Sequence, residues 1–262
     1  SRIQPAKVRN LRPPIWQSSW MRAAAVLLLV AVGLWMVLQP GQGPQELVWT
    51  TISTQGEMRP VNLPDGSIIW LNKNSKISFP ETFEERSVRL EGEAFFDVAK
   101  LDGKKFFIQA GDTKTEVLGT TFNIRAYHKE PIVEVTVFSG KVSLESAQDE
   151  AKEVILMPKD KGVYYKTGQK LEKTENADSN ALAWKSGQLK FEQITLREIL
   201  PTIVRFYQIK VEADSPSILN CTFTGSFEKT NLEEVLESIA FALNLEVKKQ
   251  DNTYRLSGKG CN

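Results

Sequence analysis

The longest apolar run of the chain lies near its N-terminus, from Ala23 to Leu38. This run, AAAVLLLVAVGLWMVL, contains no charged residue, and as a helix it would reach roughly 24 Å, slightly less than the ~30 Å hydrocarbon core of a bilayer. The segment before it, residues 1–22, carries five basic side chains and no acidic one. The pattern predicts a single transmembrane helix over residues 23–38, with residues 1–22 as a cytoplasmic juxtamembrane segment.

Aromatic and basic residues flank the apolar run where a membrane helix needs anchors. Trp16 and Trp20 would lie at one interface and Trp35 near the other, and Arg22 would extend its side chain toward the headgroups. A cleaved signal peptide is the alternative, but no small-x-small cleavage site follows Leu38. Residues 39–47 are rich in proline and glycine, which ends the helix and forms a linker. We expect everything after this linker to lie outside the cytoplasm.

Between residues 48 and 173, apolar and polar residues alternate in short runs that are separated by turn residues. A period of two is typical of strands with one buried face. The apolar positions of the clearest runs are Val88, Leu90, Gly92, Ala94, Phe96 and Val98, then Phe122, Ile124 and Ala126, then Val133, Val135 and Val137. The pattern predicts an all-β domain over residues 48–173, built as a roll, a sandwich or a solenoid-like stack.

An internal repeat with an offset of 36 residues follows a polar linker at residues 174–183. The aligned pairs are Phe191 with Phe227, Leu196 with Leu232, Glu198 with Glu234, Leu200 with Leu236, Ile203 with Ile239, Ile209 with Leu245 and Val211 with Val247. Each copy reads strand, helix, strand, and Thr195 and Asn231 are suited to cap the two helices. Pro201 predicts a kink or an early irregularity in the first helix. We expect residues 184–258 to form an α+β module of two βαβ units that share one small sheet under two helices.

Composition excludes several classes of function. The formal net charge is only +1, which argues against a nucleic-acid partner. His128 is the only histidine, so a histidine-based metal site is excluded, and no motif for a cofactor or a catalytic nucleophile occurs. We therefore expect a protein without metal or cofactor that is not an enzyme. Cys221 and Cys261 are the only cysteines, and an oxidising compartment would allow them to pair.

Three acidic residues share one face of the clearest predicted strand. Glu91, Glu93 and Asp97 lie at positions that could hold a cation or form a carboxylate pair. The other face of this strand is apolar, so a half-buried strand would direct these acids toward solvent in any case. We expect a solvated polar face.

Four segments of the predicted β domain resemble the periplasmic domain of FecR-type anti-sigma regulators in order and spacing. They are LPDGSIIWLN (residues 63–72), Phe79-Pro80, RLEGEAFFDV (residues 89–98) and VLGTTFN (residues 117–123). The C-terminal repeat resembles the small STN-like module, named for the short N-terminal domain of secretins and TonB-dependent transporters. The resemblance to FecR-type regulators covers the apolar run and about two-thirds of the region that follows it, and the resemblance to the STN-like module covers the C-terminal repeat.

The resemblance implies an inner-membrane protein with a single pass, a cytoplasmic N-terminus and periplasmic C-terminal domains. Such a regulator would relay a signal from the signalling domain of a TonB-dependent outer-membrane transporter to an extracytoplasmic-function sigma factor. The sigma-binding part would precede Ser1 and is missing from this sequence. A membrane-anchored module that binds carbohydrate or peptidoglycan in the periplasm is the alternative.

The resemblance also implies a site of self-cleavage at Gly119-Thr120. In some regulators of this type the threonine hydroxyl attacks the preceding carbonyl at such a pair, and the resulting ester is hydrolysed. The alternative is an ordinary turn that leads into a strand.

A contact with a partner protein is expected at a sheet edge of the C-terminal module. Unpaired edges of a small sheet can accept a strand from a partner. The uncharged segment Thr222, Phe223, Thr224, Gly225, Ser226 and Phe227 is the predicted edge, and an internal strand is the alternative.

Overall fold

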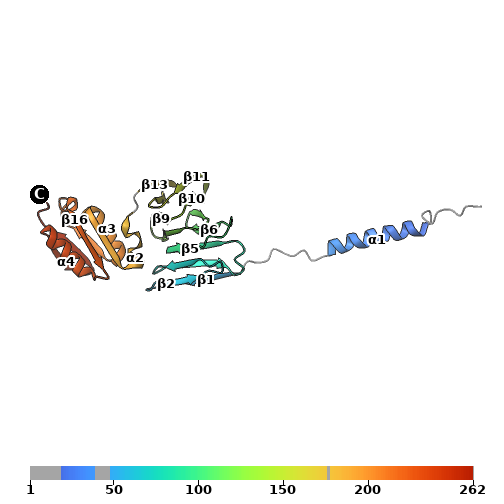
Figure 1. The fold of residues 1–262 in the computed structure, drawn as a ribbon, viewed down its shortest axis with the longest axis horizontal. Helices are drawn as coiled ribbons and strands as arrows, with labels where there is room; N and C mark the ends of the chain where they lie inside the picture. The colour runs from blue at the N-terminus through green and yellow to red at the C-terminus, as the bar shows by residue number, and fades with distance from the viewer. Residues whose placement is uncertain (1–18, 39–47, 176–177, 262) are drawn as a thin grey trace, which may run out of the picture. The chain divides into compact units, whose positions relative to one another are not determined.

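A computed structural model describes residues 19–38, 48–175 and 178–261 (Figure 1). The chain divides into two compact units, residues 1–46 and 47–262, which are considered separately. The first unit contains helix α1 (Ser19–Leu38), whose described apolar side chains are exposed, among them Trp20 and Trp35. Trp16 lies outside the described residues, and so does the 39–47 linker. Within the described ranges, no helix meets the length and hydropathy required to cross a membrane.

The second unit begins with an all-β domain, as the alternating pattern predicts. Its strands are β1 (Trp49–Ser53), β2 (Arg59–Asn62), β3 (Ile68–Leu71), β4 (Lys76–Pro80), β5 (Ser87–Asp97), β6 (Phe106–Ala110), β7 (Thr113–Val117), β8 (Thr121–Ala126), β9 (Ile132–Ser139), β10 (Val142–Ser146), β11 (Asp149–Leu156), β12 (Lys161–Tyr165) and β13 (Lys170–Thr174). Hydrogen bonds join these 13 strands into one continuous sheet.

The sheet divides at β5 into two layers that enclose one core. The first layer has the order β1-β4-β5-β6-β7-β10-β11, and the second has the order β2-β3-β5-β8-β9-β12-β13. In both layers the spatial order follows the chain, because successive strand pairs are added alternately to one layer and then the other. This stacking is a solenoid-like roll. Apart from Gly92, the apolar positions predicted on the three clearest runs lie in its core.

Strand β5 belongs to both layers because it bends at Gly92. Its first half pairs with β4 and β6, and its second half pairs with β3 and β8. Gly92 has a φ of +100°, and a Cβ added there would lie 2.7 Å from the Cα of Ser75. Only glycine combines this dihedral with such a close approach of two backbones. The bend directs the second half of β5, including Glu93, into the second layer.

The C-terminal module has the predicted repeats but not the predicted single sheet. Its elements are the short helices η2 (Ser179–Leu182), α2 (Ala183–Ser186) and η3 (Ile218–Asn220), the helices α3 (Leu196–Tyr207) and α4 (Leu232–Leu243), and the strands β14 (Gln188–Thr195), β15 (Lys210–Ala213), β16 (Thr222–Glu228), β17 (Glu246–Gln250) and β18 (Thr253–Ser257). The first strands of the two repeats pair as β14-β16, whereas the second strands join a separate sheet, β15-β18-β17.

The extra strand β18 explains why the single-sheet prediction is wrong. It follows the second repeat and lies between β15 and β17, so those two strands do not extend the β14-β16 pair. Helix α3 contacts β14 and β15, and α4 contacts β16 and β17, so each helix packs against both sheets. The apolar stripes of both helices lie in one core, separate from that of the β domain.

The predicted helix caps of the two repeats are present in the structure. The Glu198 carboxylate accepts a hydrogen bond from the backbone N–H of Thr195 at 3.3 Å, and Asn231 accepts one from Glu234 at 2.9 Å, so both helix starts are capped. Helix α3 continues through Pro201 without interruption, so the irregularity expected there does not end the helix. A disulfide joins Cys221 to Cys261.

Candidate functional site

Three charged residues form a row across neighbouring strands of the second layer, on the face opposite the core. Glu93 on β5 pairs in register with Arg125 on β8, which in turn pairs with Glu134 on β9. Residues directly opposite one another on adjacent strands lie close enough for their side chains to interact. The row therefore alternates acid, base and acid, and we call it the charged row.

Glu93 is the most buried member of the charged row, with a side chain only 1% exposed. Its Oε1 accepts hydrogen bonds from Asn123 Nδ2 at 2.9 Å and from Arg205 at 3.1 Å. Its Oε2 accepts from Asn72 Nδ2 at 2.9 Å and from Arg125 at 2.8 Å. A buried carboxylate is tolerated when its oxygens are paired in this way. The expectation of a solvated face is therefore wrong for Glu93, although Glu91 and Asp97 are exposed as predicted.

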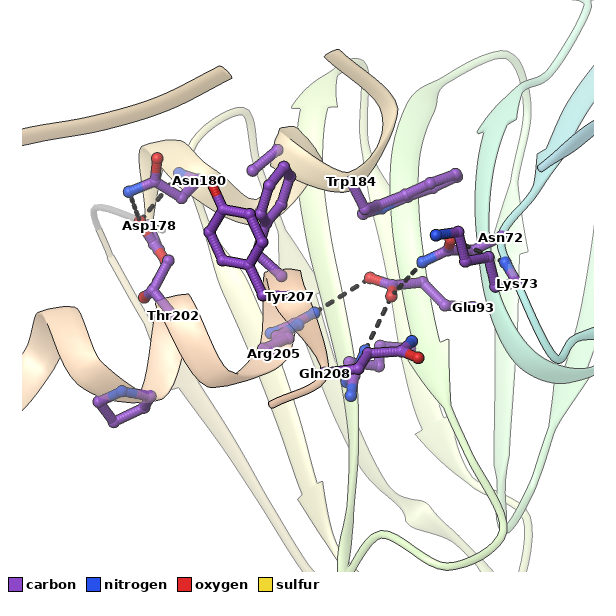
Figure 2. A pocket seen from close by; sticks show the side chains of 15 residues that line it. Asn72, Lys73, Glu93, Asp178, Asn180, Trp184, Thr202, Arg205, Tyr207 and Gln208 are labelled. Atoms are coloured by element: carbon purple, nitrogen blue, oxygen red, sulfur yellow. Dashed lines mark hydrogen bonds and ion pairs between the residues drawn. The ribbon is translucent and has the colours of Figure 1, made fainter. Parts of the chain in front are cut away.

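Arg205 reaches the charged row from the C-terminal module. It lies in the last turn of α3, and its guanidinium contacts Glu93 at 3.1 Å (Figure 2) and Glu134 at 3.4 Å. Burial by itself would lower the pKa of Arg205, but the nearby carboxylates, first Glu93 and then Glu134, outweigh it, so the pKa is raised above its usual value. Arg205 therefore carries a fixed positive charge between two carboxylates of the β domain.

Arg125 is held on both sides within the β domain. Besides Glu93, it pairs with Glu130, whose Oε2 accepts from Arg125 Nε at 2.9 Å. Its guanidinium also lies over the ring of Tyr127, 4.7 Å from the ring centre. Burial raises the pKa of Tyr127, whose hydroxyl donates to the Lys73 carbonyl at 2.9 Å. Arg125 is thus fixed without any contribution from the C-terminal module.

A cleft of about 350 Å³ lies where the C-terminal module meets the charged row. Figure 2 shows Arg205 extending from α3 toward Glu93, with Asn72 on the opposite side of the carboxylate. The lining also includes Lys73, Trp184, Thr202 and Gln208. Among the described residues, no cluster of three or more histidine, cysteine or acidic side chains could hold a metal ion. The guanidinium and carboxylate groups around the cleft bond to one another, an arrangement suited to holding two parts of a chain together.

A second contact between the module and the β domain involves aromatic rings. The ammonium group of Lys185 on α2 lies 4.8 Å from the ring centre of Trp70 and 5.0 Å from that of Phe95. Both rings are on the second layer, on strands β3 and β5. A cation over an aromatic face contributes about 0.5–1 kcal/mol at an exposed site. Arg205 and Lys185 are thus two cations of the module that contact the β domain.

Gly119 and Thr120, the predicted cleavage pair, lie in the turn between β7 and β8. A Cβ on Gly119 would lie 2.8 Å from the Cα of Lys100, so the turn requires glycine. Thr120 is buried, and its hydroxyl donates to the Lys141 carbonyl at 3.1 Å. Both residues therefore have a role in packing this turn, and cleavage stays a prediction.

The predicted edge segment forms β16, which is one strand of a two-stranded sheet. Among the described strands, β16 pairs only with β14, so its other edge has no strand partner. Phe223 points into the module core and Thr222 is exposed. The hydroxyl of Thr224 accepts a hydrogen bond from the backbone N–H of Gln193 at 2.9 Å, where β14 is irregular. Binding of a partner at this edge is not tested by these observations.

The sequence pattern does not predict a role for Arg125 or Arg205, and its prediction that Glu93 faces solvent is wrong. The sequence feature that could have indicated burial of Glu93 is the presence of Trp70 and Phe95 on the outward face of the second layer. Large aromatic residues on a face assigned to solvent indicate that something covers it. A cover of this kind would also bury the neighbouring Glu93 and create a need for a cationic partner.

Two family models match the chain, and together they cover more than half of it. The model described as FecR protein matches residues 50–143, within the β domain. The model described as FecR, C-terminal matches residues 188–256, within the C-terminal module. No protein with a curated description matches the chain significantly.

Two solved structures are similar to this chain in fold and sequence. Both are crystal structures of a candidate anti-sigma factor from Parabacteroides distasonis, at 2.50 and 1.65 Å resolution. They are 26% and 27% identical to this chain, with TM-scores of 0.63 and 0.62. Each match covers 81% of this chain and 100% of the solved one.

Proposed function

We propose that this chain, which belongs to the FecR family, acts as an anti-sigma regulator whose β domain and C-terminal module receive a signal outside the cytoplasm. The observation that carries the proposal is the match of both family models, supported by solved neighbours that are themselves described as candidate anti-sigma factors. The site agrees with a regulatory role, because its charged groups join two modules and do not form a catalytic arrangement.

The proposed topology is a single pass of the inner membrane with the N-terminus in the cytoplasm. Two independent features support it. The basic residues before the apolar run and the absence of acids there follow the positive-inside rule. The Cys221–Cys261 disulfide supports an oxidising compartment, such as the periplasm, for the C-terminal module.

The function is tested by transcription in cells that contain or lack the protein. If it regulates a sigma factor, its removal changes the transcripts of one promoter class, and the complete protein restores them. A reporter active only outside the cytoplasm, fused after Asn262, tests the topology separately. Unchanged transcripts would contradict the regulatory proposal, and an active cytoplasmic reporter at the same position would contradict the orientation.

We further propose that the input comes from the signalling domain of a TonB-dependent transporter, and that the C-terminal module is STN-like and binds this domain. The support is the unpaired edge of β16, which can accept a strand and so satisfy its backbone groups. A second surface could compete for this role. Phe241 on α4 is 91% exposed and lines a groove next to β17, which is also an edge strand.

Charge introduced at the edge of β16 is expected to weaken binding of the signalling domain at least tenfold, because a new charge must be desolvated there. Thr222→Glu is preferred to a substitution at Thr224, because the Thr224 hydroxyl supports the irregular part of β14 and its loss could disturb the fold. Affinity is measured with the purified full chain in detergent. Lys190→Glu on β14 is the control, since Lys190 is exposed and its ammonium group forms an ion pair with the neighbouring Glu192. Loss of binding in Phe241→Glu and not in Thr222→Glu would assign the contact to the α4–β17 groove instead.

Self-cleavage at Gly119-Thr120 is decided by intact-mass measurement on protein refolded without proteases. Two fragments that co-purify, one ending at Gly119 and one beginning at Thr120, would establish cleavage if Thr120→Ala stays whole. A single full-length mass after prolonged incubation would exclude it for this protein.

A further inference from the structure

Breaking the contact between the C-terminal module and the charged row would have different consequences for Glu93 in the β domain and for Arg205 in the module. Glu93 accepts hydrogen bonds from Asn72, Asn123 and Arg125, all within the β domain, and only the fourth comes from Arg205. If Arg205 moved away, three donors would still hold the buried carboxylate. Arg205 itself is 31% exposed and would become hydrated on release.

The remaining contacts also favour a separable arrangement. The apolar residues of the β domain and of the module form two distinct cores with no member in common. The ammonium group of Lys185 lies over the rings of Trp70 and Phe95. Buried apolar area is the main source of stable association, so two modules that keep separate apolar cores can separate at modest cost.

We propose that Arg205 is an ionic latch that holds the C-terminal module against the charged row and opens without leaving a buried charge unpaired. In the closed state the guanidinium bridges Glu93 and Glu134 on strands β5 and β9. In the open state the β domain keeps its own Glu93–Arg125–Glu130 network, and the module moves as a unit. The latch therefore connects the state of the module to exposure of the outer face of the second layer.

The path from the proposed partner edge to the latch is short. Strand β16 pairs with β14, and β14 leads directly into α3, which carries Arg205 in its last turn. A strand added to β16 would act on this sheet and on the helix that follows it. The coupling from β16 to Arg205 rests on the proposed function, because it requires a partner that binds β16. The latch does not depend on that function, because it concerns only the contact between two modules of one chain.

The test is a distance measurement between the modules in the full chain. Spin labels are attached to cysteines introduced at Lys129, in an exposed turn of the β domain, and at Glu237, on the exposed side of α4. The two native cysteines are joined to each other, so the introduced thiols are the labelling sites. Arg205→Glu brings a third acid beside Glu93 and Glu134, and we expect the main distance to lengthen and broaden. Arg205→Lys, which keeps the charge, is expected to retain the wild-type distance as its main population.

Arg197→Glu is the matched control, because Arg197 lies on the same helix and its described contact is with Asn220 in the module itself. Formation of the Cys221–Cys261 bridge in each variant reports that the module has folded. A folded Arg205→Glu protein with the wild-type distance would overturn the latch. So would an equal lengthening in Arg197→Glu. Neither result would bear on sigma-factor regulation, which the transcript measurement tests separately.

Discussion

Replacing Glu93 by alanine is expected to lower the free energy of unfolding of the β domain by about 3–5 kcal/mol, the range for removing one partner of a buried ion pair. The reason is that the change leaves buried donors on Asn72 and Asn123 without their acceptor, and leaves Arg125 with Glu130 alone. Each buried donor left unsatisfied adds about 1–3 kcal/mol of lost hydration. Urea unfolding of the full chain in detergent, followed by hydrogen exchange of the β-domain amides, measures the change.

Glu91 provides the matched control on the same strand. Its side chain is 55% exposed, and its pKa is lowered by a hydrogen bond from Lys76. A surface pair of this kind contributes about 0–1 kcal/mol, so Glu91→Ala should change stability little. Similar losses in Glu91→Ala and Glu93→Ala would mean that burial of the charged row does not determine the effect. Glu93→Gln should fall between the two, because it keeps the shape and one acceptor while losing the charge.

The β domain could be predicted from sequence because its strands bury one face each. Alternation with a period of two depends only on the direction of successive side chains, so Val88, Leu90, Ala94 and Phe96 were assigned to the core correctly. The alternation of apolar and polar residues does not predict the bend at Gly92 that divides β5 between two layers. That bend depends on the close approach of Ser75, which is distant in sequence.

The charged row could not be predicted in the same way, because the period-two pattern of β5 assigns Glu93 to an outward face and does not reveal what covers that face. The residues that contact Glu93 include Arg205, more than 100 residues later, and Asn72, which follows strand β3. The single-sheet error in the C-terminal module has a similar origin. The repeat predicted the strands and helices, but the pairing of β15 with β18 is a non-local choice.

The pairing of Cys221 with Cys261 was left open by the sequence and is present in the structure. The bridge closes a chain segment with a sequence separation of 40 residues and attaches the C-terminal end to the start of β16. Cys221 is buried in the module core, whereas Cys261 is exposed. The bridge therefore connects the end of the chain to the core at the strand that carries the proposed partner edge.

Removing this bridge is expected to destabilise the C-terminal module by up to about 4 kcal/mol, the value that the chain-entropy model gives for a loop of this length. The double variant Cys221→Ala, Cys261→Ala frees the chain in the unfolded state, and its module should unfold at lower denaturant concentration while the β domain is unaffected. The measurement is urea unfolding followed by hydrogen exchange, which reports the two modules separately. Reduced wild-type protein is the control, because it lacks the bridge but keeps the buried Cys221 side chain. If reduced and oxidised wild type unfold alike and only the alanine variant is weakened, the loss comes from core packing around Cys221 and the bridge does not stabilise the module.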